Sequence, residues 1–532
     1  MDEFDFVVIG AGSAGGPIVD RLTAAGRHSV LLLEAGPDAK SPWLSIPVGF
    51  AKTFLDPAVN WKFATQPEAQ LGGRRIYWPR GKVIGGSSAI NGMVYIRGLA
   101  SDYDQWRQMG NEGWSFEDCL PYFRRLEAFA DGETELRGGN GPVKITRSEY
   151  QNELGDTFLD ACAEVGLSET SDFNGPGQAG AGYYHATASG GRRNSTARTY
   201  IAAARRRPNC HIVTRAHVER VVVEDGRAVG VAYSIGGKKR IARARREVIL
   251  SAGAVGSPQL LQLSGIGAGA HLSGLGIPVV HDLPGVGENL QDHFCIRSTY
   301  RTWWRLSLND DLYPLYRRIG AAFVYALTRT GPLTAMPAFA GAFAKLLPHS
   351  SEPDTQFHFF PWSVDRMDEG PHSFSGFTIL ANQSRPESRG HIRITTREAS
   401  APPSIAANYL SAETDRQAVV EAGKFVRLLA RSAALARIVT DELLPGVEVW
   451  TDEDFLAYAR KEGQSAYHPV GTCRMGHDPG AVVDPQLRVH GIAGLRIADA
   501  SVMPTLVSGN TNAACMMIGE KASDLILADA QR

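Results

Sequence analysis

The chain has 532 residues, of which 43% are hydrophobic and 21% charged, and its 55 Lys and Arg nearly balance 56 Asp and Glu. That length allows two or more domains with substantial cores, and no apolar run is long enough to cross a bilayer. The balanced charge gives no global field that would recruit nucleic acid, and six scattered cysteines without a Cys-x-x-Cys pair predict neither a disulfide framework nor a metal site.

The first predicted element is a buried parallel strand over 4–9, a run of aromatic and β-branched residues. It leads into Gly-x-Gly-x-x-Gly and then into a helix that ends at Gly26. This pattern predicts a dinucleotide-binding turn, with the phosphates at the positive end of the helix dipole. The residues assigned to cofactor binding here are Gly10, Gly12, Ser13, Ala14 and Gly15.

A second strand is predicted over 30–33, and it ends in Glu34, about 20 residues after the glycines. An acid at that distance binds the ribose hydroxyls, and its charge would repel a 2′-phosphate, which argues against NADP. Ala35 is assigned to the same site. Because the first strand begins at Phe4, we expect no signal peptide and a cytoplasmic location, with peripheral membrane association left open.

A Gly-Gly-Ser-Ser run at 85–88 predicts backbone that lies flat against a planar ligand or a phosphate. Together with the amino-terminal glycine motif and a His-Pro segment at 467–476, this loop resembles the glucose-methanol-choline (GMC) family of FAD-dependent oxidoreductases. Some members attach the flavin through a His just before the Asn of this loop, where this chain has Ile90, so the resemblance implies noncovalent FAD. The FAD contacts assigned to the family motifs are Val83, Gly86, Asn91, Val94 and, beside the adenine, Val218.

The same resemblance implies an α/β fold, in which a Rossmann-like FAD-binding domain carries an inserted α+β substrate domain built on an antiparallel sheet. We assign 1–295 to the main part of the FAD domain, with excursions toward the substrate domain near 37–80 and 150–200. The aromatic-rich region 296–455 is assigned to the substrate domain, and 456–532 to a return to the FAD domain that carries the catalytic residues.

The catalytic groups are predicted in this return. Pro469 restricts His468 to an extended backbone, and an unperturbed pKa of roughly 6.5 suits a histidine to accept an alcohol proton. A predicted helix after 512 would aim its positive end at the flavin, and the resemblance places both segments over the isoalloxazine. We predict that His468 is the base and that Asn512 orients the alcohol oxygen. The cofactor contacts assigned to this region are Asp499, Ala500, Asn510 and Thr511.

The substrate pocket is assigned to Phe339, Phe359 and Tyr467. Alternation over 356–360 predicts a strand with one face toward a cavity. Choline-oxidising members of the family place an acid in the pocket, and a rough match of 333–343 puts Phe339 at that position. Because an uncompensated cation in an apolar pocket is costly, we favour a neutral primary alcohol, aliphatic or aromatic, and keep choline as the alternative.

Three reaction classes are compatible with the sequence. The leading one is FAD-dependent oxidation of the alcohol to an aldehyde, by a dehydrogenase rather than an oxidase. The family also includes lyases with redox-idle FAD, and an NAD-linked dehydrogenase would rest on the glycine motif alone. The electron acceptor, which could be oxygen, a quinone or a cytochrome, is not fixed by the sequence. His293, next to Asp292 in a predicted loop, is expected to be structural.

Overall fold

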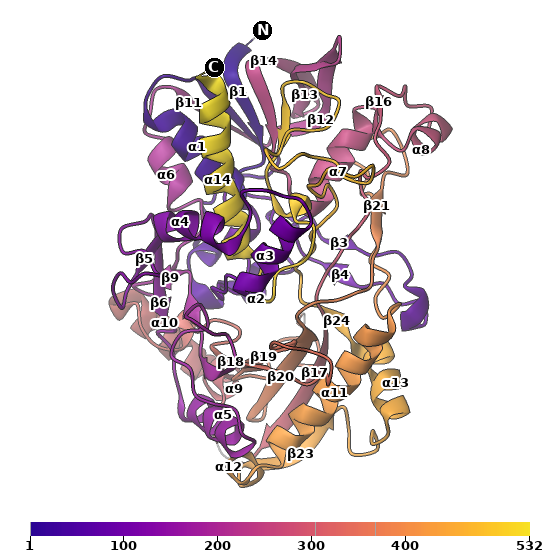
Figure 1. Cartoon of the computed structure of the whole chain (residues 1–532). Helices are drawn as coiled ribbons and strands as arrows, with labels where there is room; N and C mark the ends of the chain where they lie inside the picture. Colours follow the sequence, from indigo (N-terminus) through magenta and orange to yellow (C-terminus); the bar gives the residue numbers. More distant parts are fainter. Residues whose placement is uncertain (1, 304, 368, 532) are drawn as a thin grey trace.

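The computed structural model describes residues 2–303, 305–367 and 369–531, and its first sheet joins segments from both ends of the sequence (Figure 1). Four strands run parallel in the order β11, β2, β1, β14, and β25 pairs in parallel with β14. An antiparallel pair, β13 and β12, extends the sheet from β14. The strands are β1 (Asp2–Ile9), β2 (Val30–Glu34), β11 (Cys210–Thr214), β12 (His217–Glu224), β13 (Arg227–Ile235), β14 (Lys238–Leu250) and β25 (Leu495–Ile497).

Helix α1 (Gly15–Ala24) begins directly after the glycine turn, so the predicted strand, turn, helix and second strand are confirmed. It packs against α6 (Tyr200–Ala204) and α14 (Asn512–Ala530), and Figure 1 shows α14 in yellow alongside α1 near both chain ends. The Arg21 guanidinium donates from Nε (2.9 Å) and Nη2 (2.8 Å) to the fully buried Glu520 carboxylate. The end of the chain is thereby attached to the dinucleotide turn.

The second sheet is entirely antiparallel, as the sequence predicts for the substrate domain. Its path is β23 (Val439–Leu444), β17 (Phe294–Thr302), β20 (Gly376–Gln383), β19 (Thr355–Phe360), β18 (Ala340–Ala344) and β7 (Gly180–Tyr183), with β24 (Gln464–Ser465) on β17. The helices at this sheet are α5 (Glu153–Glu164), α11 (Glu413–Ala430), α12 (Ala433–Ala436) and α13 (Asp452–Glu462). The mixed α/β fold is confirmed, whereas the boundaries at 295 and 455 stay a prediction.

Shorter elements connect and flank the two sheets. The helices are α2 (Phe50–Thr53), α3 (Ala100–Gln108), α4 (Phe116–Leu126), α7 (Gly253–Leu263), α8 (Gly269–Gly274), α9 (Leu308–Leu312) and α10 (Leu315–Thr328). The small strands are β3 (Phe63–Ala64), β4 (Tyr77–Trp78), β5 (Glu127–Phe129), β6 (Val143–Arg147), β8 (His185–Ala186), β9 (Ala188–Ser189), β10 (Arg192–Arg193), β15 (Ile266–Gly267), β16 (His281–Asp282), β21 (His391–Arg393) and β22 (Ser404–Ala406). In the described ranges, no helix has both the length and the apolar character that a bilayer span requires.

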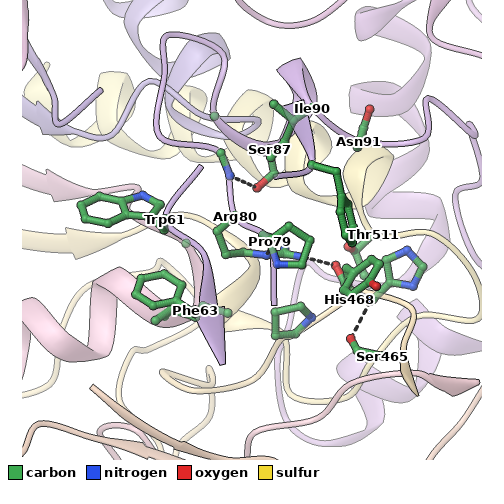
Figure 2. Close-up of a pocket in the computed structure, with 18 of the residues that line it drawn as sticks. Trp61, Phe63, Pro79, Arg80, Ser87, Ile90, Asn91, Ser465, His468 and Thr511 are labelled. Atoms are coloured by element: carbon green, nitrogen blue, oxygen red, sulfur yellow. Dashed lines mark hydrogen bonds between the residues drawn. The ribbon is translucent and has the colours of Figure 1, made fainter. Parts of the chain in front are cut away.

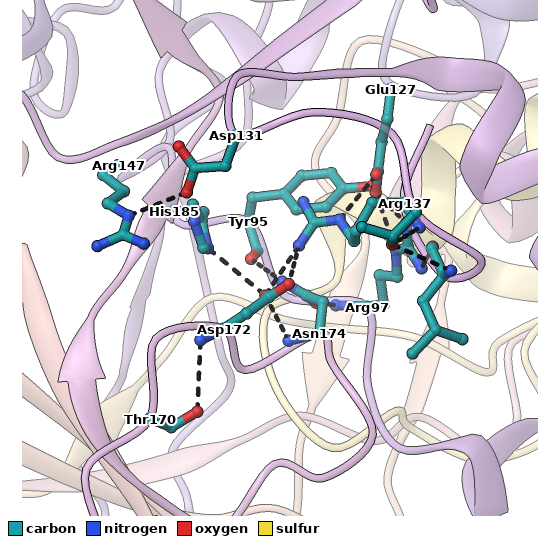
Figure 3. Close-up of polar contacts among 12 residues, drawn as sticks. Tyr95, Arg97, Glu127, Asp131, Arg137, Arg147, Thr170, Asp172, Asn174 and His185 are labelled. Atoms are coloured by element: carbon teal, nitrogen blue, oxygen red, sulfur yellow. Dashed lines mark hydrogen bonds and ion pairs between the residues drawn. The ribbon is translucent and has the colours of Figure 1, made fainter. Parts of the chain in front are cut away.

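A buried ionic cluster fixes the chain just after the Gly-Gly-Ser-Ser loop (Figure 3). The Glu127 carboxylate accepts hydrogen bonds from Arg97 Nε and Arg137 Nε, each at 2.9 Å, and Arg137 Nη1 also donates to both oxygens of Asp172 at 2.8 Å. The Tyr95 hydroxyl donates to the same Glu127 oxygen as Arg97. Because two cations face two carboxylates, the buried charges compensate one another and hold four segments together.

Candidate active site

A cavity of about 1040 Å³ is lined by residues from both sheets and from the loops between them. Its wall includes the glycine turn, the loop after β4, the inner side of β19 and β20, and the segments around His468 and Asn512. Figure 2 shows part of this wall, with Trp61 and Phe63 on one side and His468 and Thr511 on the other. The volume exceeds that of most drug-sized pockets, so it can take a large cofactor together with a small ligand.

The nucleotide end of the cavity carries the predicted ribose-binding acid. Glu34 ends β2 with its carboxylate buried, accepting the backbone N–H of Ala11 at 3.0 Å and of Gly36 at 2.8 Å. Burial raises the pKa of Glu34 to about 7, against the opposing effect of these two hydrogen bonds. The cavity lining here also contains the predicted residues Gly10, Gly12, Ser13, Ala14, Ala35 and Val218.

Two glycine segments approach each other so closely that side chains are excluded between them. A Cβ on Gly86 would lie 2.7 Å from the Gly12 Cα, and Gly86 has a φ of +51°. A Cβ on Gly10 would lie 2.4 Å from the Ser251 carbonyl oxygen. Bare backbone N–H groups at the start of a helix, beside a buried acid, are the donor set that a dinucleotide pyrophosphate and ribose require, so the cradle fits FAD.

Two of the predicted cofactor residues do not line the cavity. Gly15 packs against the Gly10 carbonyl, where a Cβ would lie 2.0 Å away, so it serves helix packing. Val83 is fully buried in a small cluster with Leu44 and Val59. Their direct contact with FAD stays a prediction, whereas the residues around them, Gly86, Asn91 and Val94, do line the cavity.

A buried arginine that the sequence analysis missed fixes the orientation of Asn91. Arg193 Nη1 donates to Asn91 Oδ1 at 2.6 Å, and the Met93 N–H donates to the same oxygen at 3.1 Å. Asn91 lines the cavity, and these two donors hold its amide oxygen in place. Burial lowers the pKa of Arg193 to about 9. Nothing in its local sequence marks it, because it lies in β10, about a hundred residues from the loop it supports.

At the other end of the cavity, His468 is hydrogen-bonded to a second histidine. His293 Nε2 lies 2.9 Å from the Ser384 carbonyl oxygen, which can only accept, so this nitrogen carries the proton. His293 Nδ1 is then an acceptor, and His468 Nδ1, 3.0 Å away, donates to it. In the neutral His468 ring the lone pair is therefore on Nε2. The sequence predicts only a structural role for His293. In the structure, the hydrogen bond of His293 also sets the tautomer of the proposed base.

Electrostatics keep His468 neutral. Burial, followed by the nearby charges of His293, His358 and Arg80, holds its pKa well below the usual value, and burial lowers the pKa of His293 to about 4. The His468 backbone N–H donates at 2.7 Å to Asp292, whose carboxylate also accepts from the hydroxyls of Ser465 and Tyr409. The imidazole is thus rigidly placed in the form that can accept a proton.

The residue beside the reactive nitrogen is Asn510, while the orienting role predicted for Asn512 stays a prediction. Asn510 Nδ2 lies 3.1 Å from His468 Nε2, and Asn510 Oδ1 accepts from Gln356 Nε2 at 3.2 Å, which directs the amide nitrogen toward the histidine. Asn512 is the first residue of α14, and its Oδ1 accepts from the Ser13 hydroxyl at 2.7 Å. The two-residue offset turns Asn512 toward the dinucleotide turn, although both asparagines line the cavity.

Substituting the two asparagines separately tests which of them orients the alcohol oxygen. We expect Asn510→Ala to slow flavin reduction by roughly 10-fold or more with little change in FAD content, because it removes a donor at the reacting oxygen. Asn512→Ala is the matched control, and it should weaken FAD binding while leaving reduction of the bound flavin nearly unchanged. Anaerobic stopped-flow reduction and FAD titration measure the two effects. The opposite pattern would return the orienting role to Asn512.

The predicted pocket phenylalanines point into the core, Phe359 from β19 and Phe339 from the residue just before β18. Phe359 stacks on Phe158 of α5 with ring centroids 4.5 Å apart, and Phe339 packs against Tyr183 and Phe359. Both are fully buried and neither lines the cavity. Because side chains alternate along a strand, the cavity wall is formed instead by their neighbours Ala338, His358 and Phe360. Tyr467, the third predicted residue, does line the cavity.

The remaining predicted residues, Asp499, Ala500 and Thr511, also line the cavity. Asp499 is fully occupied by protein donors: it accepts from the Gly253 N–H at 2.9 Å, the Ser257 hydroxyl at 2.6 Å and the Ser501 N–H at 2.8 Å. Its carboxylate therefore ties the start of α7 to the segment that precedes Asn510.

Comparison with known sequences identifies the family of this chain. The family model for GMC oxidoreductases matches residues 4–295 and 386–519 in its amino-terminal and carboxy-terminal parts. A protein of Vibrio vulnificus named oxygen-dependent choline dehydrogenase is 42% identical over 99% of this chain and 95% of its own length. A protein of the same name from Photobacterium profundum is 40% identical over 98% of this chain and 93% of its own length.

Solved structures with the same fold include pyridoxine 4-oxidase from "Mesorbium loti", with a TM-score of 0.88, 28% identity and 98% coverage of both chains. A formate oxidase from Aspergillus oryzae RIB40, in a study of its FAD modification, has a TM-score of 0.93 at 26% identity, covering 100% of this chain and 99% of its own. The cradle around Gly12, Glu34 and Gly86 fits the cofactor of that family. The chain therefore belongs to the GMC family of FAD-dependent oxidoreductases, which act on CH–OH groups.

Proposed function

We propose that the protein oxidises a neutral primary alcohol, aliphatic or aromatic, to the aldehyde. His468 Nε2 accepts the hydroxyl proton, and the Asn510 amide donates to the alcohol oxygen. Noncovalently bound FAD supplies the hydride acceptor, flavin N5. The observation that carries this proposal is the unprotonated Nε2 of His468, which faces Asn510 in the cavity with its tautomer fixed by His293.

The proton transfer follows from the hydrogen-bond directions. The alcohol O–H donates to His468 Nε2 and replaces the contact of that nitrogen with Asn510, whose N–H then turns to the developing alkoxide. The proton stays on His468 Nε2, while Nδ1 keeps its proton and its bond to His293. Because burial opposes the imidazolium, His468 gives this proton up again readily at neutral pH.

A neutral substrate fits the charges around this end of the cavity. Every described acid in the lining is already engaged: Glu34 and Asp499 with backbone N–H groups, Glu462 with Arg297 at 3.7 Å, and Asp365 with His372 at 3.1 Å. The cation closest to the base is Arg80, which donates to the Tyr467 carbonyl oxygen. In the part of the chain that the structure describes, no free carboxylate meets a substrate cation beside His468.

Choline is the second candidate, on two grounds. The relatives cited above are named for choline oxidation. The cavity lining also contains a group of aromatic side chains, which could hold a quaternary ammonium by cation–π contacts: Phe50, Phe54, Phe360, Trp362 and Tyr467. Within this group, Phe54 and Tyr467 have ring centroids 5.6 Å apart, and Phe360 and Trp362 have centroids 5.6 Å apart.

Anaerobic mixing with a panel of primary alcohols and choline distinguishes the candidates. We expect neutral alcohols to bleach the yellow flavin band, with the aldehyde as product, and choline to bleach it more slowly. Bleaching by choline alone would reject the neutral-substrate proposal. Bound flavin that no alcohol reduces would favour a lyase. Admitting air to the reduced enzyme tests the acceptor: slow reoxidation supports a dehydrogenase that uses a quinone or cytochrome, and rapid reoxidation supports an oxidase.

A further inference from the structure

Helix α10 carries a stripe of exposed apolar side chains that nothing in the described chain covers. Leu315, Ile319, Phe323 and Leu327 recur every four residues and so share one face. Their exposed fractions are 61%, 61%, 65% and 70%, and Tyr316, next to the stripe, is 70% exposed. We call these five residues the α10 stripe.

The α10 stripe faces away from the protein core. Only Ala321 and Tyr325 of this helix are buried, and the Tyr325 hydroxyl donates to the Gly191 carbonyl oxygen at 2.8 Å on the opposite side. Isolated exposed apolar residues are common on soluble proteins, whereas a contiguous helical face of them marks an interaction surface. None of the five lines the cavity, so the stripe is separate from the site described above.

Helix α10, which carries this apolar face, also carries cationic side chains. Helix α10 contains no Asp or Glu, but Arg317 and Arg318 lie within it and Arg329 follows it directly. On the opposite side of the helix, near the Gly191 contact of Tyr325, the exposed Arg192 and Arg198 add to the positive charge of this region. The acids nearby are Asp310, Asp311 and Glu149. Asp311 pairs with Arg317 at 3.7 Å, Asp310 caps α9, and Glu149 accepts the N–H groups of Gly190 and Gly191 at 2.7 Å.

We propose that α10 docks the protein on the surface of an anionic lipid bilayer. An apolar helical face with large aliphatic and aromatic residues, flanked by arginines, is the pattern of helices that lie in the plane of a membrane interface. The apolar stripe would enter the acyl boundary, while the arginines meet lipid phosphates. A second copy of this chain fits less well, because pairing two α10 faces would bring their arginine rims together without acids to match.

Vesicle flotation of the FAD-loaded enzyme tests this proposal. We expect binding to phosphatidylcholine vesicles that contain phosphatidylglycerol, little binding to phosphatidylcholine alone, and weakening as salt is raised. The triple variant Ile319→Ser, Phe323→Ser and Leu327→Ser should lose about tenfold or more of the bound fraction, since it removes most of the buried apolar area. Arg317→Gln with Arg318→Gln should remove most of the preference for the anionic lipid.

The matched control is Val447→Ser with Trp450→Ser, two apolar residues that are 78% and 61% exposed in the chain after β23, outside the α10 stripe. This control should bind vesicles like the unaltered enzyme, and all variants should reduce their flavin at the same rate. Equal vesicle binding by the triple variant would overturn the proposal. Dimers that form without lipid and are lost in the triple variant would also overturn it, in favour of an interface between two copies.

Discussion

Replacing His468 with alanine is expected to leave FAD bound and to slow its reduction by substrate by roughly 10²–10⁴-fold, the usual contribution of a general base. The physical reason is that Nε2 of His468 is the buried acceptor whose lone pair faces the cavity beside Asn510. Stopped-flow reduction under anaerobic conditions measures the rate, and the flavin absorbance of the purified variant confirms that the cofactor is still bound.

A matched control is available in the same wall. His358 also lines the cavity, and burial lowers its pKa to about 3, but its side chain hydrogen-bonds with Asn382, whereas His468 Nε2 faces Asn510. His358→Gln should therefore cost much less than His468→Ala. Added imidazole should restore part of the rate in His468→Ala alone, because the small base can occupy the space that the side chain leaves. Equal losses in the two variants would contradict the assignment of His468 as the base.

The second large effect is expected from Gly86→Ala. The added Cβ would lie 2.7 Å from the Gly12 Cα, which is backbone and cannot rotate away, so the loop and the dinucleotide turn must separate. At an overpacking cost of about 1–3 kcal/mol, FAD binding should weaken by roughly 10–100-fold. Titration of the apoprotein with FAD, followed by quenching of flavin fluorescence, gives the dissociation constant.

Gly72→Ala is the control that separates the effect of the steric clash from the effect of the backbone conformation. Gly72 also has a positive φ, of +63°, but nothing lies within 4 Å of the Cβ that would be added. Both substitutions carry the strain of a non-glycine residue in the left-handed region, and only Gly86→Ala adds the collision. If both variants bound FAD equally well, the close approach of the two segments would not be needed for the cofactor.

Local sequence patterns were sufficient for the nucleotide end of the site. The strand, the glycines and Glu34 all lie within the first 34 residues, so their spacing alone places the acid near the turn, and the structure agrees. The catalytic end depends on contacts between distant residues. His293 is 175 residues from His468, and Arg193 is 102 residues from Asn91, so no local period relates them. These partners are visible only once the chain is folded.

The differences at Asn512 and Phe359 between the expected and the observed side-chain directions have a common cause. Asn510 and Asn512 differ by two positions at the start of a helix, and Phe359 and Phe360 by one position in a strand. In each case the residue type and the region were right, and the direction of the side chain was not. The direction of each side chain is set by tertiary contacts. Asn512 of α14 accepts from the Ser13 hydroxyl, and Phe359 of β19 packs on α5. A shift of one residue in a strand exchanges the cavity face for the core face.

The contact between Ser13 and Asn512 has a consequence for biosynthesis. These residues are 499 positions apart, yet both belong to the cofactor cradle, and α14 also covers α1. At ribosomal rates of about 5–20 residues per second, roughly 25–100 s separate the synthesis of the glycine turn from that of the helix that completes it. The amino-terminal part of the first sheet is therefore synthesised well before α14 and β25. FAD can bind to the complete cradle only after nearly the whole chain has left the ribosome.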